Sequence, residues 1–529
     1  MASTVMDLVR DVEVPPWVLF SVVAGLVFIG WQFLFNGLDP REPPEVRSRI
    51  PFVGHLLGML WYKAEYVTVL SRKVNLPIYT MRVLGTRMYI LRSPELIQKT
   101  FANPKAFTFD TFAATAVRRL LNISEPDMKV LLQEPGPENR PSYSHDIHDL
   151  THSTLTPSAA LSQLNDAFQT RLAKSFNEID TDGTTVNLHQ WSRDVVTHAA
   201  CAAILGPDNP YEDDPSLISA LWDFETDLVL LILRIFPTIT APKGYQARAR
   251  LTSAYLSYQH RELWKHGSAL LQGRREIGKK HGFNDTQIAE WDLLFTIAAV
   301  TNAIPISFWM VSYILADPSL LSEVREELQA IVQMEELKGE KVLKLDPRMI
   351  RERCPLLISI WEELLRFTSQ PTLGRYVTTD TVLNNEYLVK AGSVVQIPTQ
   401  ITQGSSSIWG PSASDFNPRR FLRKEENKKL GKEEREQERL QRRAYTPFGG
   451  GKNLCPGRHA AANETLSFVA MVVVAFTVER EDGGVFGVIW EATRAAGASV
   501  PKAEGDVRVV VRRREELRGV RLEFAGEER

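Results

Sequence analysis

The strongest constraint in the sequence is a glycine-rich loop that carries a single cysteine near the end of a long chain. The run PFGGGKNLCPG spans residues 447–457, and its cysteine, Cys455, is one of only three among 529 residues. Three consecutive glycines let the backbone pass close to a flat ligand, because no Cβ stands in the way. Pro-Gly then turns the chain, and an alanine-rich run predicts a helix from about His459. The thiol is therefore presented beside a helix N-terminus.

The position of this cysteine supports two interpretations. Most single cysteines are buried and chemically inert. A thiol near a helix N-terminus is instead stabilised as the thiolate, because the helix dipole and the free N–H groups favour negative charge. A thiolate beside a glycine-lined surface can serve as the axial ligand of a haem iron. The flanking pattern Phe-x-x-Gly-x-x-x-Cys-x-Gly favours the second interpretation.

This segment resembles the haem-binding loop of the cytochrome P-450 family, and the resemblance covers roughly residues 50–525. It implies a mostly α fold with small peripheral β-sheets, and haem b as the cofactor, with Cys455 as the thiolate ligand of the iron. The chain departs from the family at Asn453, where arginine or histidine is usual. The resemblance also implies cofactor-binding roles for other loop residues: Phe448, Gly449, Gly451 and Gly457.

Composition excludes several other classes of protein. Hydrophobic residues make up 44% and charged residues 24% of the chain, which suits a large packed core rather than disorder. A formal net charge of −2 gives no basic excess, so nucleic acid is not expected as the main partner. Cys201, Cys354 and Cys455 form no disulfide framework, which fits a reducing compartment for the main body.

An uncharged apolar stretch at residues 17–35 predicts a transmembrane anchor, because its length can span a hydrocarbon core. The alternative, a cleaved signal peptide, would have a shorter apolar region followed by a small-residue cleavage site. More positive residues follow the stretch than precede it, which places the body in the cytosol. We expect a lumenal tail at 1–16, a single-pass anchor at 17–35 and a Pro-rich linker at 36–51. A catalytic domain at 52–529 follows, and the microsomal resemblance implies the endoplasmic reticulum membrane.

Residue patterns along the body predict mostly helices with a few short strands. A strand–turn–strand is expected at 79–91, around Gly85. One long helix is expected at 285–316, capped by Asp285 and ended before Pro318. The other predicted elements are helices at 317–328 and 356–368, a strand at 394–398, and a final antiparallel pair at 507–512 and 520–524.

Glu363 and Arg366 lie three residues apart on a predicted apolar helix, so they can pair on one face. A buried pair needs further partners, and Arg420 is the candidate. The resemblance implies that these three residues form a structural triad behind the cysteine loop. It also gives Arg375 a contact to a haem propionate, which a guanidinium can bind bidentately; a surface arginine at a strand start is the alternative.

The long helix contains Thr301-Asn302 where the family has an acid–threonine pair. Asn302 can donate and accept hydrogen bonds but has no useful pKa, so it is not a general acid. Pro305 removes one backbone donor, and the carbonyl of Thr301 loses its helical partner. A kink there would open a groove for water or a substrate hydroxyl; a plain proline kink with a satisfied Asn302 is the alternative. We expect Thr301 and Asn302 to be the catalytic-site residues.

Asn302, together with the absence of arginine two residues before the cysteine, resembles one subgroup of the family. This subgroup includes sterol 7α-hydroxylase, sterol 12α-hydroxylase and prostacyclin synthase. Some of its members hydroxylate sterols with reductase electrons, and another rearranges a peroxide without a reductase. We expect an apolar, bulky substrate. The candidate pocket residues, for which core packing is the alternative, are Phe109, Phe112, Phe295, Ala298 and Leu373.

Two further segments depart from the family or stand out by charge. Residues 145–152 are rich in histidine where the family has a tryptophan and an arginine that touch a propionate. The histidines are candidates to replace that contact, but a solvated helix end is the simpler interpretation. Residues 419–443 hold eleven basic and six acidic residues. They predict a solvated, charged helix or a docking face for an acidic redox partner.

Three functions are compatible with these features. The first is a membrane-anchored haem-thiolate monooxygenase, an oxidoreductase that takes electrons from an NADPH-dependent reductase. It would insert one oxygen atom of O₂ into a small lipophilic substrate, such as a steroid, a terpenoid or another secondary metabolite. The second is a haem-thiolate isomerase or dehydratase that acts on an oxygenated or peroxide substrate without a reductase. The third is a non-catalytic haem protein or membrane scaffold. We expect the first.

Overall fold

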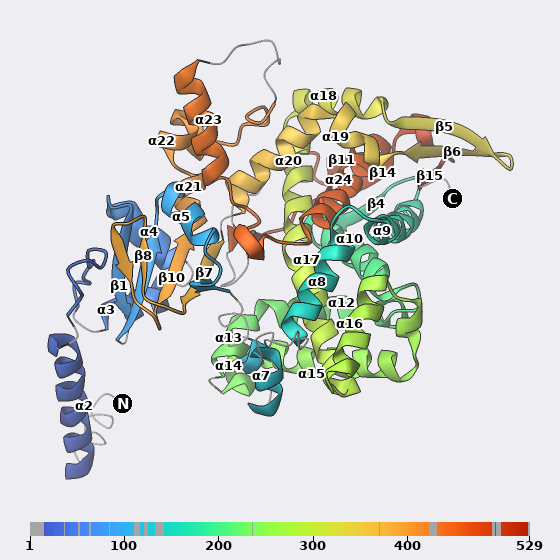
Figure 1. Cartoon of the computed structure of the whole chain (residues 1–529). Coiled ribbons are helices and arrows are strands. Elements are labelled where there is room, and N and C mark those ends of the chain that lie inside the picture. The colour runs from blue at the N-terminus through green and yellow to red at the C-terminus, as the bar shows by residue number, and fades with distance from the viewer. Residues whose placement is uncertain are drawn as a thin grey trace, which may run out of the picture. The chain divides into compact units, whose positions relative to one another are not determined.

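The computed structural model describes residues 15–35, 37–50, 53–62, 65–83, 85–109, 117–120, 125–132, 142–234, 236–369, 371–422, 431–488, 492–493 and 499–526 (Figure 1). The chain divides into two compact units. The small unit comprises Met1–Phe107 and Gly374–Ile397, and the large unit comprises Thr108–Leu373 and Pro398–Arg529. Most described residues are helical and the sheets are small, as predicted.

The small unit is built on a sheet of five strands in the order β1-β2-β10-β7-β3. β1 (Ile78–Val83) and β2 (Thr86–Leu91) are antiparallel and turn at Gly85, whose φ of +82° suits glycine. The predicted strand–turn–strand is therefore confirmed. β10 (Val394–Pro398) has the predicted bounds and runs parallel to β2. The other elements are α2 (Pro16–Phe35), α3 (Gly54–Tyr62), α4 (Tyr66–Lys73), α5 (Pro94–Phe101), β3 (Phe107–Thr108), β7 (Thr372–Val377), β8 (Thr381–Leu383) and β9 (Tyr387–Val389).

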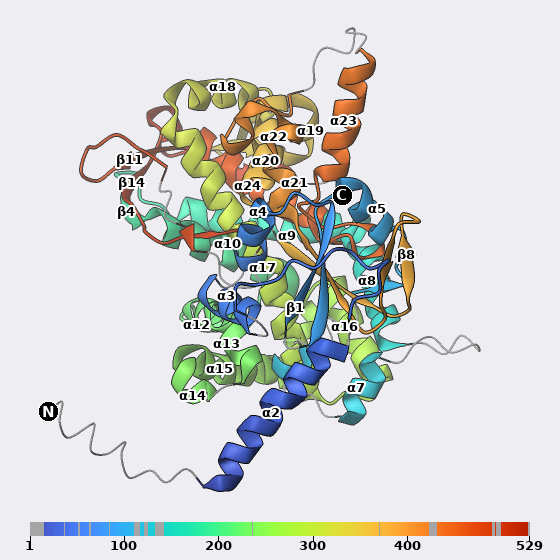
Figure 2. The same cartoon turned by 90° about the vertical axis from the view of Figure 1, so that its left-hand side faces the viewer.

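The large unit is built around α17 (Asp285–Ala316), a helix of 32 residues with the predicted bounds. Figures 1 and 2 both show α10 and α24 beside it, and α15 also packs against it. The remaining helices are α7 (Glu125–Leu132), α8 (Tyr143–Leu155), α9 (Ala159–Asn177), α10 (Leu188–Leu205), α11 (Pro210–Asp213), α12 (Leu217–Thr226), α13 (Leu228–Leu233), α14 (Pro237–Thr240), α15 (Pro242–His260), α16 (Ala269–Lys280), α18 (Pro318–Gln329), α19 (Ile350–Arg353), α20 (Pro355–Thr368), α21 (Thr399–Gln403), α22 (Ser406–Trp409), α23 (Lys432–Ala444) and α24 (Arg458–Ala475).

The start of α17 corrects one prediction. The N-cap is Asn284, not Asp285. The Asn284 side chain accepts the N–H of Gln287, and the Gln287 side chain accepts the N–H of Asn284, both at 2.9 Å. This capping box satisfies two donors that a helix otherwise leaves without partners, so it outweighs an aspartate one residue later.

The strands near the C-terminus also correct a prediction. β14 (Arg508–Arg513) and β15 (Arg521–Phe524) both form, but they do not pair with each other. β14 lies antiparallel between β11 and β4, and β15 runs parallel to β6. Strand patterns report burial on a face and not the identity of the neighbouring strand. The strands that share these two sheets with β14 and β15 are β4 (Thr184–Asn187), β5 (Val332–Leu337), β6 (Glu340–Leu345) and β11 (Phe476–Arg480). A separate antiparallel pair consists of β12 (Ala492–Thr493) and β13 (Lys502–Ala503).

Two apolar helices bear on the predicted membrane anchor. Among the described residues, α17 has the length and hydropathy needed to cross a membrane, but 67% of its most apolar window is buried inside the protein. It is therefore a core helix. The predicted anchor at 17–35 does form a helix, α2, but its passage through a membrane remains a prediction. The predicted domain boundaries also remain predictions.

Candidate active site

The cysteine loop, residues 445–457, joins α23 to α24 in the large unit. The Cys455 N–H donates to the carbonyl of Phe448 at 3.0 Å, which closes the loop on itself. Gly449 and Gly451 have φ angles of +76° and +68°, a region that favours glycine. These two positions therefore combine the required backbone geometry with a surface that lacks Cβ atoms. Helix α24 begins at Arg458, one residue before the predicted start.

Cys455 differs from the other two cysteines in its exposure. Its side chain is half-buried, whereas Cys201 and Cys354 are buried. Burial raises the pKa of the Cys455 thiol, while the N–H groups of Gly457 and Arg458 and the Arg458 charge lower it. The helix N-terminus thus favours the thiolate, but burial outweighs it in the protein alone. A bound metal cation reverses that balance, because a coordinating thiol loses its proton.

Behind the loop, the structure brings Glu363, Arg366 and Arg420 together. Arg366 donates through Nε and Nη2 to the two Glu363 carboxylate oxygens, at 2.7 and 2.8 Å. Arg420 Nε lies 3.0 and 3.1 Å from the same two oxygens. The side chains of Glu363 and Arg366 are 0% and 1% exposed, so this carboxylate is fully desolvated. Such a buried charge is tolerable because it is paired and fully hydrogen-bonded.

Two residues that the sequence did not single out link this triad to the cysteine loop. Buried Gln403 accepts the N–H of Thr446 at 3.1 Å through Oε1, and its Nε2 donates to the Ser369 carbonyl. The Ser369 hydroxyl donates to the Pro447 carbonyl at 3.3 Å. Arg366 Nη1 donates to the Gln403 carbonyl at 2.7 Å. The charged triad therefore sets the position of the loop through Gln403 and Ser369. Neither residue belongs to a recognisable sequence motif, so the sequence alone did not indicate them.

On α17, Ala298 is exposed and Asn302, one turn later on the same face, is half-buried. The Asn302 Oδ1 accepts the N–H of Ser499 at 3.0 Å. Thr301 is half-buried, and the helical run continues through Pro305. Because Pro305 has no N–H, the Thr301 carbonyl lacks its helical partner.

The backbone of α17 beside Pro305 is held from α24. The Ser307 hydroxyl donates to the Ala303 carbonyl at 2.8 Å and lies 3.1 Å from the Thr465 hydroxyl. Thr465 also reaches the Ala303 carbonyl at 3.4 Å. These buried contacts tie the middle of α17 to the helix that follows Cys455, so the cysteine side and the Asn302 segment belong to one packed body.

The remaining predicted residues are spread over both units. Arg375 lies in the small unit, where it is buried, donates to the Gly374 carbonyl at 2.8 Å and stands over the Phe101 ring. The structure therefore does not relate Arg375 to Cys455. Phe109 is exposed, and Phe112 lies outside the described residues.

Phe295 and Leu373 were also predicted for the pocket, and both are assigned to the large unit, which includes the first two residues of β7. Leu373 is close to the cysteine loop, because a Cβ placed on Gly449 would lie 4.0 Å from its Cδ1. Phe295, on α17, is half-buried, and its ring faces the Arg274 guanidinium at 4.5 Å. Leu373 is thus the pocket residue whose contacts agree best with the cysteine loop.

The groups around the cysteine loop fit a haem. The Cys455 thiol is half-buried, and the glycines of the loop leave room beside it for a flat ligand. The histidine-rich helix is α8, on which the rings of His148 and His152 lie 4.3 Å apart. The Nε2 of His148 is buried and has no hydrogen-bond partner among the described residues. An anionic group such as a propionate would satisfy it.

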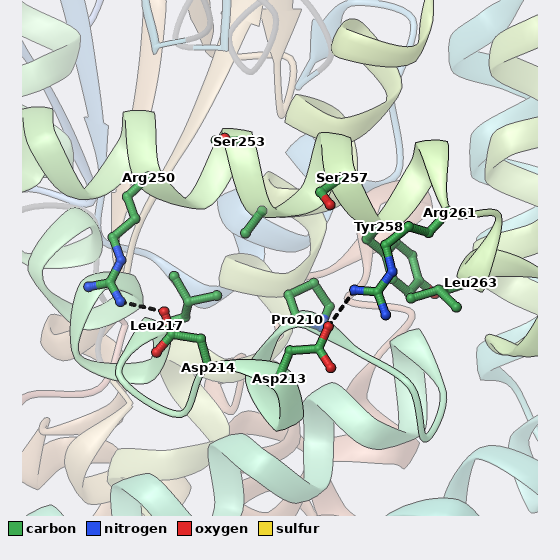
Figure 3. Close-up of a pocket in the computed structure, with 11 residues that line it drawn as sticks. Pro210, Asp213, Asp214, Leu217, Arg250, Ser253, Ser257, Tyr258, Arg261 and Leu263 are labelled. Atoms are coloured by element: carbon green, nitrogen blue, oxygen red, sulfur yellow. Dashed lines mark hydrogen bonds and ion pairs between the residues drawn. The ribbon is translucent and has the colours of Figure 1, made fainter.

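A separate groove of about 380 Å³ lies between α11, the start of α12 and α15 (Figure 3). Arg250 pairs with Asp214, and Arg261 pairs with Asp213, each at 2.6 Å. These ion pairs already satisfy the charges that line the groove, and its lining includes no cysteine. The cysteine loop is therefore the better candidate for the active site.

Comparison with known proteins agrees with this geometry. The family model for cytochrome P450 matches residues 43–489, a stretch that includes the triad, α17 and Cys455. The chain therefore belongs to the cytochrome P450 family, and it is an oxidoreductase of the monooxygenase type.

Its relatives come from fungi and animals. A cytochrome P450 monooxygenase of Gibberella zeae is 30% identical over 88% of this chain and 87% of the relative. The cytochrome P450 monooxygenase nodJ of Hypoxylon pulicicidum is 29% identical over 92% and 93%. The human 7-alpha-hydroxycholest-4-en-3-one 12-alpha-hydroxylase is 24% identical over 88% and 93%. Fungal monooxygenases and sterol hydroxylases are thus both similar to this chain.

Proposed function

We propose that this protein is a membrane-anchored haem-thiolate monooxygenase that hydroxylates a lipophilic steroid, terpenoid or related secondary metabolite. The overall reaction takes RH, O₂, NADPH and H⁺ to ROH, H₂O and NADP⁺, with electrons delivered by a reductase. The observation that carries the proposal is the half-buried Cys455 in its glycine loop, backed by the desolvated Glu363 ion cluster. The name of one relative, the human 7-alpha-hydroxycholest-4-en-3-one 12-alpha-hydroxylase, adds support for a sterol substrate.

The chain's residues take complementary parts in this function. Cys455 would ligate the iron of haem b, which supplies the O₂ activation that no amino-acid side chain provides. Arg375 and the Nε2 of His148 would hold the propionates. Asn302 would contact the substrate from α17, beside the apolar Ala298. Glu363, Arg366 and Arg420 would keep the cysteine loop in place and would not touch the reacting atoms.

The surroundings would be a membrane and an acidic reductase. Helix α2 is uncharged, and Trp17, Phe20 and Val27 on it are exposed, which suits a segment whose partner is lipid. On α23, Arg435, Arg439 and Arg442 are exposed at helical spacing and form a basic stripe. The proposed location is the endoplasmic reticulum membrane, with the body in the cytosol.

A second candidate is a haem-thiolate isomerase or dehydratase that acts on a peroxide or oxygenated substrate. Asn302 favours it, because an amide cannot take over proton delivery from the usual acid–threonine pair. Such a reaction consumes neither NADPH nor O₂.

Turnover with isotopic oxygen distinguishes the two candidates. We expect product labelled from ¹⁸O₂, formed only when both NADPH and the reductase are present. A spectral-shift screen of steroids and terpenoids supplies the substrate for this measurement. Unlabelled product, formed from a hydroperoxide without NADPH and reductase, would instead establish the isomerase.

A further inference from the structure

A short segment before the C-terminal sheet is fastened to α17 at two points. The N–H of Ser499 donates to Asn302 Oδ1 at 3.0 Å, and the buried indole N–H of Trp309 donates to the Pro501 carbonyl at 2.8 Å. Asn302 and Trp309 are seven residues apart, close to two helical turns, so they share one face of α17. We call residues 499–502 the strap. It therefore runs along α17 beside the segment that contains Pro305.

A third contact fastens the strap to α12. Lys502 forms an ion pair with the buried carboxylate of Glu225, and its ammonium lies over the Trp222 ring at 4.8 Å. The Trp222 indole N–H in turn donates to the Thr197 hydroxyl on α10 at 3.2 Å. The strap thus joins α17 to α12, and the side chains that hold it are mostly buried.

The contact with Ser499 settles which way the Asn302 amide faces. A backbone N–H can only donate, so the atom facing Ser499 must be the carbonyl oxygen. If the amide were reversed, the Asn302 NH₂ group would face the Ser499 N–H, and two donors would meet. The Asn302 side chain therefore has only one favourable orientation. Asn302 Nδ2 then points elsewhere, and no acceptor in the described part of the chain bonds to it. The two N–H donors of Nδ2 lie on the half-buried face of α17, next to the small and exposed side chain of Ala298.

We propose that the two ends of the Asn302 amide have separate roles: the oxygen fastens the strap to α17, and the nitrogen is thereby turned to donate a hydrogen bond to an acceptor oxygen of the substrate. The fastening half is independent of the chemistry. The role of the amide nitrogen as a donor rests on the proposed function. It restricts the candidate substrates to molecules that carry an acceptor oxygen, such as a ketone or ether, near the site of reaction. A hydroxyl group of the substrate meets this requirement only through its oxygen, as an acceptor.

The fastening is tested by hydrogen exchange at the Ser499 amide in the purified full chain. Asn302→Ala removes the acceptor, and we expect the Ser499 amide to exchange about tenfold faster, the effect of losing one hydrogen bond. Asn302→Asp keeps an oxygen acceptor and should leave this exchange near wild type. Trp309→Phe is a second variant that loosens the strap at Pro501 without touching Asn302. Unchanged exchange in Asn302→Ala would overturn the fastening.

The donor is tested by spectral titration with cholest-4-en-3-one and cholest-4-ene, which differ by one carbonyl. We expect wild type to bind the ketone about tenfold more tightly, and Asn302→Asp to lose that preference while the strap stays in place. Equal binding of the two probes by wild type, or no binding of the ketone, would overturn the donor half. A protein without a thiolate spectrum would contradict the proposed function instead, and the exchange result would stand.

Discussion

Behind the cysteine loop, one buried carboxylate receives bonds from two guanidinium groups, whereas the strap is held to α17 by single bonds between neutral groups. The Glu363 cluster also contacts the cysteine loop through Gln403, so several hydrogen bonds hold each residue of the cluster in place. At the strap, Asn302 and Trp309 contribute one hydrogen bond each. Charge-assisted, buried bonds are stronger and leave a costly unpaired charge when broken. We therefore expect the contacts behind the cysteine loop to cost more free energy to break than the contacts between the strap and α17.

The largest expected effect comes from breaking the cluster at its centre. Glu363→Gln leaves two guanidinium groups without a counter-charge in a desolvated site, so we expect a loss of about 3–5 kcal/mol in the free energy of unfolding. Chemical denaturation of the purified variant measures this loss, and haem content should fall with it. The matched control is Glu323→Gln, whose partner Arg419 adjoins Arg420. That pair is 47% and 42% exposed and is expected to contribute less than about 1 kcal/mol. Equal losses in the two variants would contradict the comparison.

A smaller effect is expected at the link between the cluster and the loop. Gln403→Leu has similar volume but leaves the N–H of Thr446 and the carbonyl of Ser369 without partners. We expect a loss of about 1–3 kcal/mol in the free energy of unfolding. The loss should be accompanied by faster release of haem to an apo-globin acceptor, because the loop loses its anchor. Release at the wild-type rate would show that Gln403 does not position the loop.

Glu464, on α24, tests what a buried carboxyl does without such pairing. It is 6% exposed, and burial raises its pKa from 4.5 to about 8. Because the folded-state pKa is the higher one, the fold favours the protonated carboxyl. The contribution of Glu464 to the free energy of unfolding is therefore greatest below about pH 4.5, and it declines as the pH rises towards 8. Glu464→Gln, which stays neutral, should flatten this part of the pH–stability curve. An unchanged curve would show that Glu464 does not titrate in this range.

Much of the fold could be predicted from local sequence. The bounds of α17 and β10 followed from apolar patterns and turn residues, and α18 and α20 agree with prediction within one residue. The capping box at Asn284 is also present in the sequence, as Asn-x-x-Gln, but asparagine and aspartate are equally good N-cap residues, so residue type alone does not choose between Asn284 and Asp285. The pairing of β14 and β15 was wrong, because a strand's pattern does not identify its neighbour.

The candidate site was predictable to a different degree in its two halves. The spacing of Glu363 and Arg366 predicted their pairing, because residues three apart share one face of a helix, whereas Arg420 was implied by the family resemblance; the structure shows both contacts. Gln403 and Ser499 form hydrogen bonds to segments that are distant in sequence, and no local pattern predicts such contacts. The contact between Asn302 and Ser499 could only come from the fold.

The central claim is that Cys455 is the thiolate ligand of a haem, and carbon monoxide tests it most directly. We expect the reduced wild-type protein with carbon monoxide to show the long-wavelength Soret band of thiolate ligation. Cys455→Ala should lose this band, while the Cys354→Ala and Cys201→Ala variants should retain it. The long-wavelength band in Cys455→Ala, or its absence from haem-loaded wild type, would contradict the account.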